Sequence, residues 1–147
     1  MVRTILGSVT GIILAVLALY GAQYGYAHFH PAPRGAVPAT PEAVAAFVSK
    51  SNPTELVDYA TSAPVQAIAC LLAGWALSAF LGGWLGAAIA KPHRGSAATV
   101  VGALVTVAVV VYATWMPAQA WITVVGLLLP MLFALLGGRL AMPRREF

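Results

Sequence analysis

The chain has 147 residues, of which 61% are hydrophobic and only 8% carry a charge. Soluble domains carry about 25% charged residues, so this composition excludes an ordinary soluble domain and indicates a membrane protein. The formal net charge of +4 is small and its basic residues are scattered, which argues against a nucleic-acid partner and for the lipid bilayer as surroundings. Cys70 is the only cysteine, which excludes an intrachain disulfide.

The first apolar segment covers residues 4–27 and follows Arg3. Its length suits a spanning helix, which needs about 20 residues. A secretory signal peptide is the alternative, because residues 25–27 form a weak cleavage pattern. The segment is long for a signal peptide, so we expect an uncleaved membrane anchor. Small residues recur along it at every fourth position, as in closely packed helices: Gly7, Gly11 and Ala15.

Residues 28–63 are rich in proline and hold three of the four acidic residues. We expect residues 28–39 to be extended. Thr40 and Asn52 each precede a proline, which is an N-cap signal, and Glu55 completes a capping box with Asn52. Two short amphipathic helices should therefore begin at these caps and lie at the membrane surface over the bundle.

Three further apolar segments follow, at residues 64–90, 97–115 and 120–142. The second span carries a GxxxG-type ladder of small residues, against which another helix backbone can pack: Gly74, Ser78, Gly82, Gly86 and Ala90. The third span is rich in valine, and valines such as Val109 are expected to face lipid. Pro130 lies inside the fourth span and predicts a kink there.

Basic residues concentrate on one side of a four-span path, where a tight loop at residues 91–96 joins two spans. That side carries Arg3, Lys91, Arg94, Arg139, Arg144 and Arg145. The other side has only Arg34 and Lys50, alongside three acidic residues. The positive-inside rule therefore places both termini in the cytoplasm and the loop of residues 28–63 outside. Aromatic residues gather at the outer interface, in agreement: Tyr20, Tyr24, Tyr26, Tyr112, Trp115 and Trp121.

These features predict a single all-α membrane domain over residues 1–147: a bundle of four transmembrane helices, with short amphipathic helices in the first outer loop. The outer loop offers the candidate metal ligands, His28 and His30, since residues two apart in an extended chain face the same side. No third ligand is fixed by the sequence. Glu55 and Asp58 are neighbours on a helix, as paired catalytic carboxylates can be, but a solvated helix face explains them better.

The spans themselves lack the groups that catalysis needs. Their hydrocarbon zone contains no Asp, Glu, Lys or His, so we expect no catalytic residue and no bound cofactor. Trp75 lies about ten residues into its span, near the middle of the bilayer. We expect its ring to fill space beside the small-residue ladder; a cofactor or quinone stacked on the ring is the alternative.

Three stretches of the chain carry a family resemblance: residues 41–48, 73–90 and 135–141. They are similar to those of small four-span bacterial inner-membrane proteins with a proline-rich first loop, a glycine-rich second span and Gly-Gly-Arg near the end. The resemblance extends over nearly the whole chain. It implies a bacterial inner membrane and assigns no functional residue.

These observations predict a non-enzymatic protein that works by helix packing, as an accessory subunit of a membrane complex or as a homo-oligomer. The motivation is abundant small-residue helix surface without intramembrane chemistry. A small oligomeric transporter or channel is the alternative, with a pore lined by Thr and Ser. A membrane enzyme using the outer loop is a third hypothesis, and it would depend on His28, His30, Glu42, Glu55 and Asp58.

Overall fold

A computed structural model describes residues 2–31, 40–90, 93–116 and 119–141, in which all regular structure is helical. The six helices in this part of the chain are α1 (Val2–Phe29), α2 (Pro41–Lys50), α3 (Pro53–Thr61), α4 (Val65–Ile89), α5 (Arg94–Trp115) and α6 (Ala120–Leu140). Four of them, α1, α4, α5 and α6, are long and apolar enough to cross a membrane. The predicted all-α class with four such helices is confirmed.

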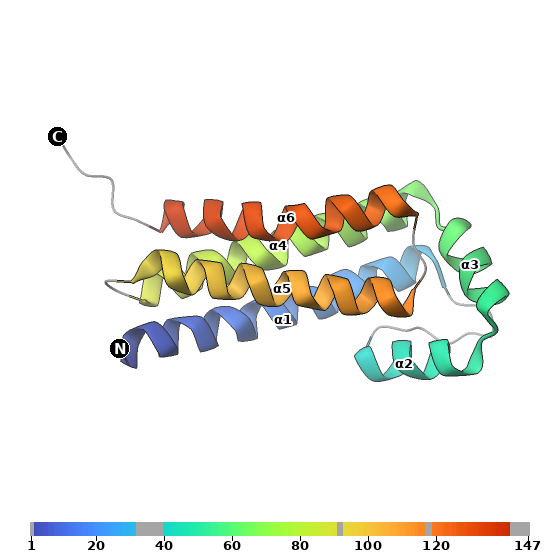
Figure 1. Ribbon diagram of the computed structural model, residues 1–147, viewed down its shortest axis with the longest axis horizontal. Helices are drawn as coiled ribbons and strands as arrows, with labels where there is room; N and C mark the ends of the chain where they lie inside the picture. Colours follow the sequence, from blue (N-terminus) through green and yellow to red (C-terminus); the bar gives the residue numbers. More distant parts are fainter. Residues whose placement is uncertain (1, 32–39, 91–92, 117–118, 142–147) are drawn as a thin grey trace.

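The four long helices form an elongated bundle with two different ends (Figure 1). The start of α1, the end of α4, the start of α5 and the end of α6 lie together, and we call this the basic end. The short helices α2 and α3 lie at the opposite, capped end. Helix α4 packs against each of the other three long helices, whereas α1 packs mainly on α4 and α5. Helix α4 is therefore the centre of the bundle.

The glycines of α4 allow α1 to approach at backbone distance. A Cβ atom added at Gly82 would lie 2.6 Å from the carbonyl oxygen of Gly11, and one added at Gly7 would lie 2.6 Å from that of Gly86. Real Cβ atoms do not approach other atoms so closely. The same interface places Gly74 against Ala22 and Ala90 against Gly7, and Ser78 is fully buried. All five residues of the small-residue ladder thus lie inside the bundle, four of them against α1.

A second side of α4 receives α6 in the same way. A Cβ atom at Gly83 would lie 2.5 Å from the carbonyl oxygen of Ala134. Gly137 of α6 lies against the backbone of Phe80, with its added Cβ 3.0 Å from the nitrogen of Trp84. Close packing of small residues therefore joins three of the four long helices, which suits association in lipid.

The buried side of α5 corrects one expectation. Val109 is 1% exposed and belongs to the core, so the prediction that it faces lipid was wrong. Val101 and Val105 are fully buried on the same face. The valines that do point outward include Val107, which is 60% exposed. A helix this rich in valine has no polar face, so its residue pattern does not indicate which side faces the bundle and which faces lipid.

Two helix boundaries differ from expectation. Helix α1 continues to Phe29, so His28 and Phe29 are helical rather than extended. The rest of the segment expected to be extended lies largely outside the described residues. Helix α5 begins at Arg94, three residues before the predicted start, so residues 94–96 belong to a helix and not to the loop. Pro130 lies inside α6 and is buried; the kink expected there stays a prediction.

The short helices begin at the predicted caps. The Thr40 hydroxyl accepts a hydrogen bond from the backbone N–H of Ala43 at 3.1 Å. The Glu55 carboxylate accepts one from the backbone N–H of Asn52 at 3.2 Å. Both helices turn apolar side chains toward the long helices, where Leu56 of α3 joins a core cluster. The prediction of two capped, amphipathic helices after the first span is confirmed.

Candidate functional site

The structure does not bring the two candidate metal ligands together. His28 is exposed at the end of α1, where its ring contacts Phe29 edge-on at 5.6 Å. His30 follows the helix, and its Nε2 donates a hydrogen bond to the carbonyl oxygen of Tyr59 at 2.7 Å. The premise of an extended chain fails here, because His28 is helical and residues two apart on a helix diverge. Among the described residues, no three metal-ligating side chains form a cluster.

His30 instead joins the end of α1 to α3. The Tyr59 hydroxyl returns the interaction by donating to the carbonyl oxygen of His30 at 2.8 Å. The two rings are stacked, with centroids 4.3 Å apart. Tyr26 packs edge-on against both rings. Desolvation by burial raises the pKa of Tyr59 and the nearby Tyr26 raises it further, so this hydroxyl stays protonated and able to donate.

Three of the five outer-loop residues considered for catalysis line one hollow. It has a volume of about 750 Å³, lies between α2 and α3, and borders His30, Glu55 and Asp58. His30 and Glu55 are engaged in structural hydrogen bonds, to Tyr59 and to the backbone of Asn52. His28 and Glu42 do not line the hollow. The polar side chains around the hollow therefore hold the ends of helices in place and are not arranged as an acid–base pair.

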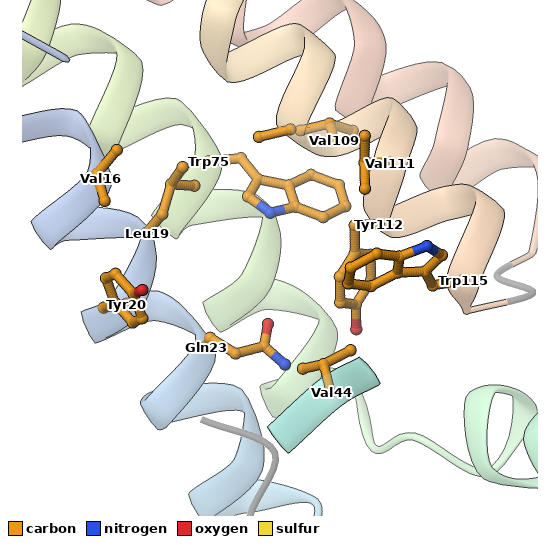
Figure 2. A pocket seen from close by; sticks show the side chains of 11 residues that line it. Val16, Leu19, Tyr20, Gln23, Val44, Trp75, Val109, Val111, Tyr112 and Trp115 are labelled. Atoms are coloured by element: carbon orange, nitrogen blue, oxygen red, sulfur yellow. The ribbon is translucent and has the colours of Figure 1, made fainter. Parts of the chain in front are cut away.

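A second cavity lies in the apolar part of the protein, in the half near the capped end. We call it the aromatic groove, and its volume is about 330 Å³ (Figure 2). Helices α1 and α5 form its walls, Trp75 of α4 projects between them, and Val44 of α2 lies at its outer end. The lining residues are Val16, Leu19, Tyr20, Gln23, Val44, Trp75, Ala108, Val109, Val111, Tyr112 and Trp115.

Trp75 is held by packing on α5 and α6. It is 5% exposed, and its ring lies edge-on to that of Tyr112 with centroids 5.8 Å apart. The ring also lies directly on Gly126 of α6, where an added Cβ atom would overlap it. Trp75 thus fills space between α4, α5 and α6, and Gly126 provides the room.

One polar pair interrupts the apolar lining. The side chains of Gln23 on α1 and Tyr112 on α5 are joined by a hydrogen bond. Figure 2 shows the two side chains reaching toward each other from α1 and α5. A phenol hydroxyl and an amide can each both donate and accept, so a pair joined by one hydrogen bond offers a donor as well as an acceptor to a bound molecule. The groove therefore combines aromatic walls with a donor at a fixed position.

Sequence reasoning missed this groove because its lining comes from four helices. Trp75 was the one signal for it, as an unusually deep tryptophan. Comparison of the chain with protein-family models, with curated proteins and with solved structures gives no match.

Proposed function

We propose that this protein is a non-enzymatic membrane protein that binds a small lipophilic molecule in the aromatic groove. The observation that carries the proposal is the groove itself. Ligand sites in proteins are concave, about 300–1,000 Å³ in volume, mostly apolar or aromatic, and contain a few fixed polar groups. The groove has a volume of about 330 Å³, four aromatic rings and one hydrogen-bonded polar pair. No described lining residue is charged.

The groove is open toward the lipid-facing side of the bundle. Tyr20, Val111 and Trp115 line it and are also 38–40% exposed. Since these residues lie on helices apolar enough to cross a membrane, their exposed atoms would contact lipid rather than water. A molecule dissolved in the bilayer would then reach the groove sideways, without crossing a polar surface.

In the same proposal the protein lies in a bacterial inner membrane, with the basic end in the cytoplasm and the capped end outside. Charge supports this orientation, because Arg3, Arg94 and Arg139 belong to the basic end. Exposed aromatic residues lie toward both ends, as interface anchors do: Tyr20, Trp115 and Trp121 in the capped half and Trp84 toward the basic end. The groove would open in the outer half of the bilayer.

Association with other subunits stays a prediction, and so does the alternative of an oligomeric transporter or channel. The ladder that motivated association packs within the chain, so a partner would have to contact other surfaces. Large aliphatic side chains such as Leu128 and Leu132 dominate the exposed face of α6. The size of the protein in mild detergent and ion flux in vesicles would test these two roles.

The proposed binding is tested by filling the groove. Ala108 lines it, whereas Ala103 lies on the same helix, is exposed and does not line it. We expect Ala108→Phe to remove a lipophilic molecule that co-purifies with the protein in native-lipid particles, as identified by extraction and mass spectrometry. Ala103→Phe is the matched control and should retain it. Val111→Phe is a second blocking variant, at a partly exposed site that tolerates bulk.

Thermal unfolding of each variant shows whether a loss reflects blocking or misfolding. Equal ligand content in folded Ala108→Phe, Val111→Phe and Ala103→Phe would refute the proposal. The proposal would also be refuted if the wild-type protein carried no molecule beyond bulk lipid and bound none of decyl-1,4-benzoquinone, decylbenzene and decylcyclohexane.

A further inference from the structure

We infer that the molecule held in the aromatic groove carries a planar ring with a carbonyl group, as quinone-type lipids do. This inference rests on the proposed binding function and names its ligand class. Two independent features of the groove support it: the aromatic side chains that form its walls, and the polar pair of Gln23 and Tyr112.

The walls favour a planar ring over an acyl chain. An acyl chain is accommodated by aliphatic side chains, of which the exposed faces of the bundle have many. The groove instead gathers four aromatic side chains, and among them the rings of Trp75 and Tyr112 already meet edge-on at 5.8 Å. Aromatic rings attract a further ring in stacked or edge-on contact beyond the effect of buried area alone.

The polar pair favours a carbonyl group on that ring. Tyr112, which is hydrogen-bonded to Gln23, brings to the groove a hydroxyl group that can donate to a ligand. A ligand that meets this donor needs an acceptor, and a carbonyl oxygen attached to a ring places the acceptor at the edge of the planar surface. A phosphate head group would need a cation, and no described residue of the lining is charged.

The position of Trp75 supports the same geometry. Its ring is fixed by contact with Gly126 and Val109, so the ring wall of the groove is preformed. A rigid planar ligand gains most from a preformed site, because neither partner has to be ordered on binding. A flexible chain would gain less.

The test compares matched probes on the detergent-solubilised full chain: decyl-1,4-benzoquinone, decylbenzene and decylcyclohexane. Dissociation constants are measured by isothermal titration, with the shift in unfolding temperature as a second readout. We expect decyl-1,4-benzoquinone to bind about threefold to tenfold more tightly than decylbenzene, the effect of one hydrogen bond. Decylbenzene should in turn bind more tightly than decylcyclohexane.

Tyr112→Phe separates the two features, since it removes the donor and keeps the ring. This variant should lose the preference for the quinone over decylbenzene while retaining affinity for decylbenzene. Tyr24→Phe is the matched control, because Tyr24 is 64% exposed and does not line the groove. The preference of this control for the quinone should equal that of the wild-type protein.

The outcomes distinguish the two proposals. Equal binding of all three probes, abolished by Ala108→Phe, would overturn the ring-carbonyl inference and leave lipophilic binding in place. Binding of none of them, with no co-purifying molecule, would refute both. A quinone preference that survives in folded Tyr112→Phe would also overturn the inference, because the donor would then lie elsewhere.

Discussion

His30 and Tyr59 bind each other twice, each side chain donating to the backbone carbonyl oxygen of the other residue, at 2.7 and 2.8 Å. The stacked rings close the same contact. The two residues stand 29 positions apart, so the pair fixes the end of α1 against α3 across the whole outer loop. The capped end therefore has a defined structure although α2 and α3 are short. Short helices alone are marginal, and tertiary contacts of this kind stabilise them.

Tyr59→Phe removes the hydroxyl that donates to His30 and leaves the ring in place. We expect a loss of about 1 kcal/mol in the free energy of unfolding, the typical net value of one hydrogen bond. Hydrogen exchange of the α3 amides should rise in the variant more than exchange in α4. Tyr24→Phe is the control, since that exposed tyrosine makes no comparable contact in the described structure. Equal exchange in the two variants would contradict the role of this bond.

The same pair predicts a pH dependence. The pKa of Tyr59 in the folded protein is raised above its ordinary value near 10. A group whose folded pKa is raised adds stability that is present below its unfolded pKa and is lost as pH rises toward the folded pKa. Stability of the capped end should therefore fall above about pH 10. Because other tyrosines also ionise there, the measured quantity is the difference between wild type and Tyr59→Phe, which should shrink at high pH.

His28 and His30 should differ sharply when replaced. His30→Ala removes the donor to Tyr59 and should destabilise the capped end, whereas His28→Ala removes an exposed ring and should leave the unfolding temperature nearly unchanged. If the two histidines shared a metal ion, both variants would lose bound metal and stability together. Metal analysis and thermal unfolding of the two purified variants therefore decide between a structural pair and a metal site.

Gly82→Ala tests the contact between α1 and α4. The added Cβ would lie 2.6 Å from a backbone carbonyl oxygen, so the helices must separate, at a cost of about 1–3 kcal/mol. Gly21→Ala is the matched control, because Gly21 lies in a spanning helix with no atom within 4 Å of the added Cβ. It should be neutral or slightly stabilising, since alanine favours helix. Equal unfolding temperatures for the two variants would show that α1 does not pack on this ladder.

Local signals in the sequence were enough for the elements of the fold. Apolar length predicted the four long helices, and Thr40 and Asn52 predicted where the short ones begin, because capping depends on residues within one turn. Orientation was different. Val109 was assigned to the lipid-facing side because an apolar helix in an apolar solvent shows no amphipathic pattern, so only its contacts with α4 and α6 determine which valines are buried.

The candidate site depended even more on distant contacts. The histidine pair was interpreted from spacing alone, and the continuation of α1 by two residues, to Phe29, was sufficient to separate the two rings. The groove gathers residues of α1, α2, α4 and α5, and no motif joins them in the sequence. The position of Trp75 in the groove depends on Gly126, which lies 51 positions later in the sequence and leaves space for the indole ring. Small residues indicate that something packs closely, but they do not name the partner.

The proposed orientation makes the last prediction. With Cys70→Ala as background, Lys50→Cys places a thiol on exposed α2 at the capped end, and Gly95→Cys places one at the exposed start of α5 at the basic end. Lys50 is exposed, and an added Cβ at Gly95 meets nothing within 4 Å, so both substitutions should leave the fold intact. In intact cells an impermeant maleimide should label position 50 and leave position 95 unlabelled until the membrane is permeabilised. The positive-inside argument requires that Arg3, Arg94 and Arg139 lie at the same end of the bundle. They do: Arg94, for instance, donates a hydrogen bond to the carbonyl oxygen of Ala141, just after α6, at 2.9 Å. Labelling at position 95 alone would reverse the orientation and would move the aromatic groove to the cytoplasmic half of the bilayer.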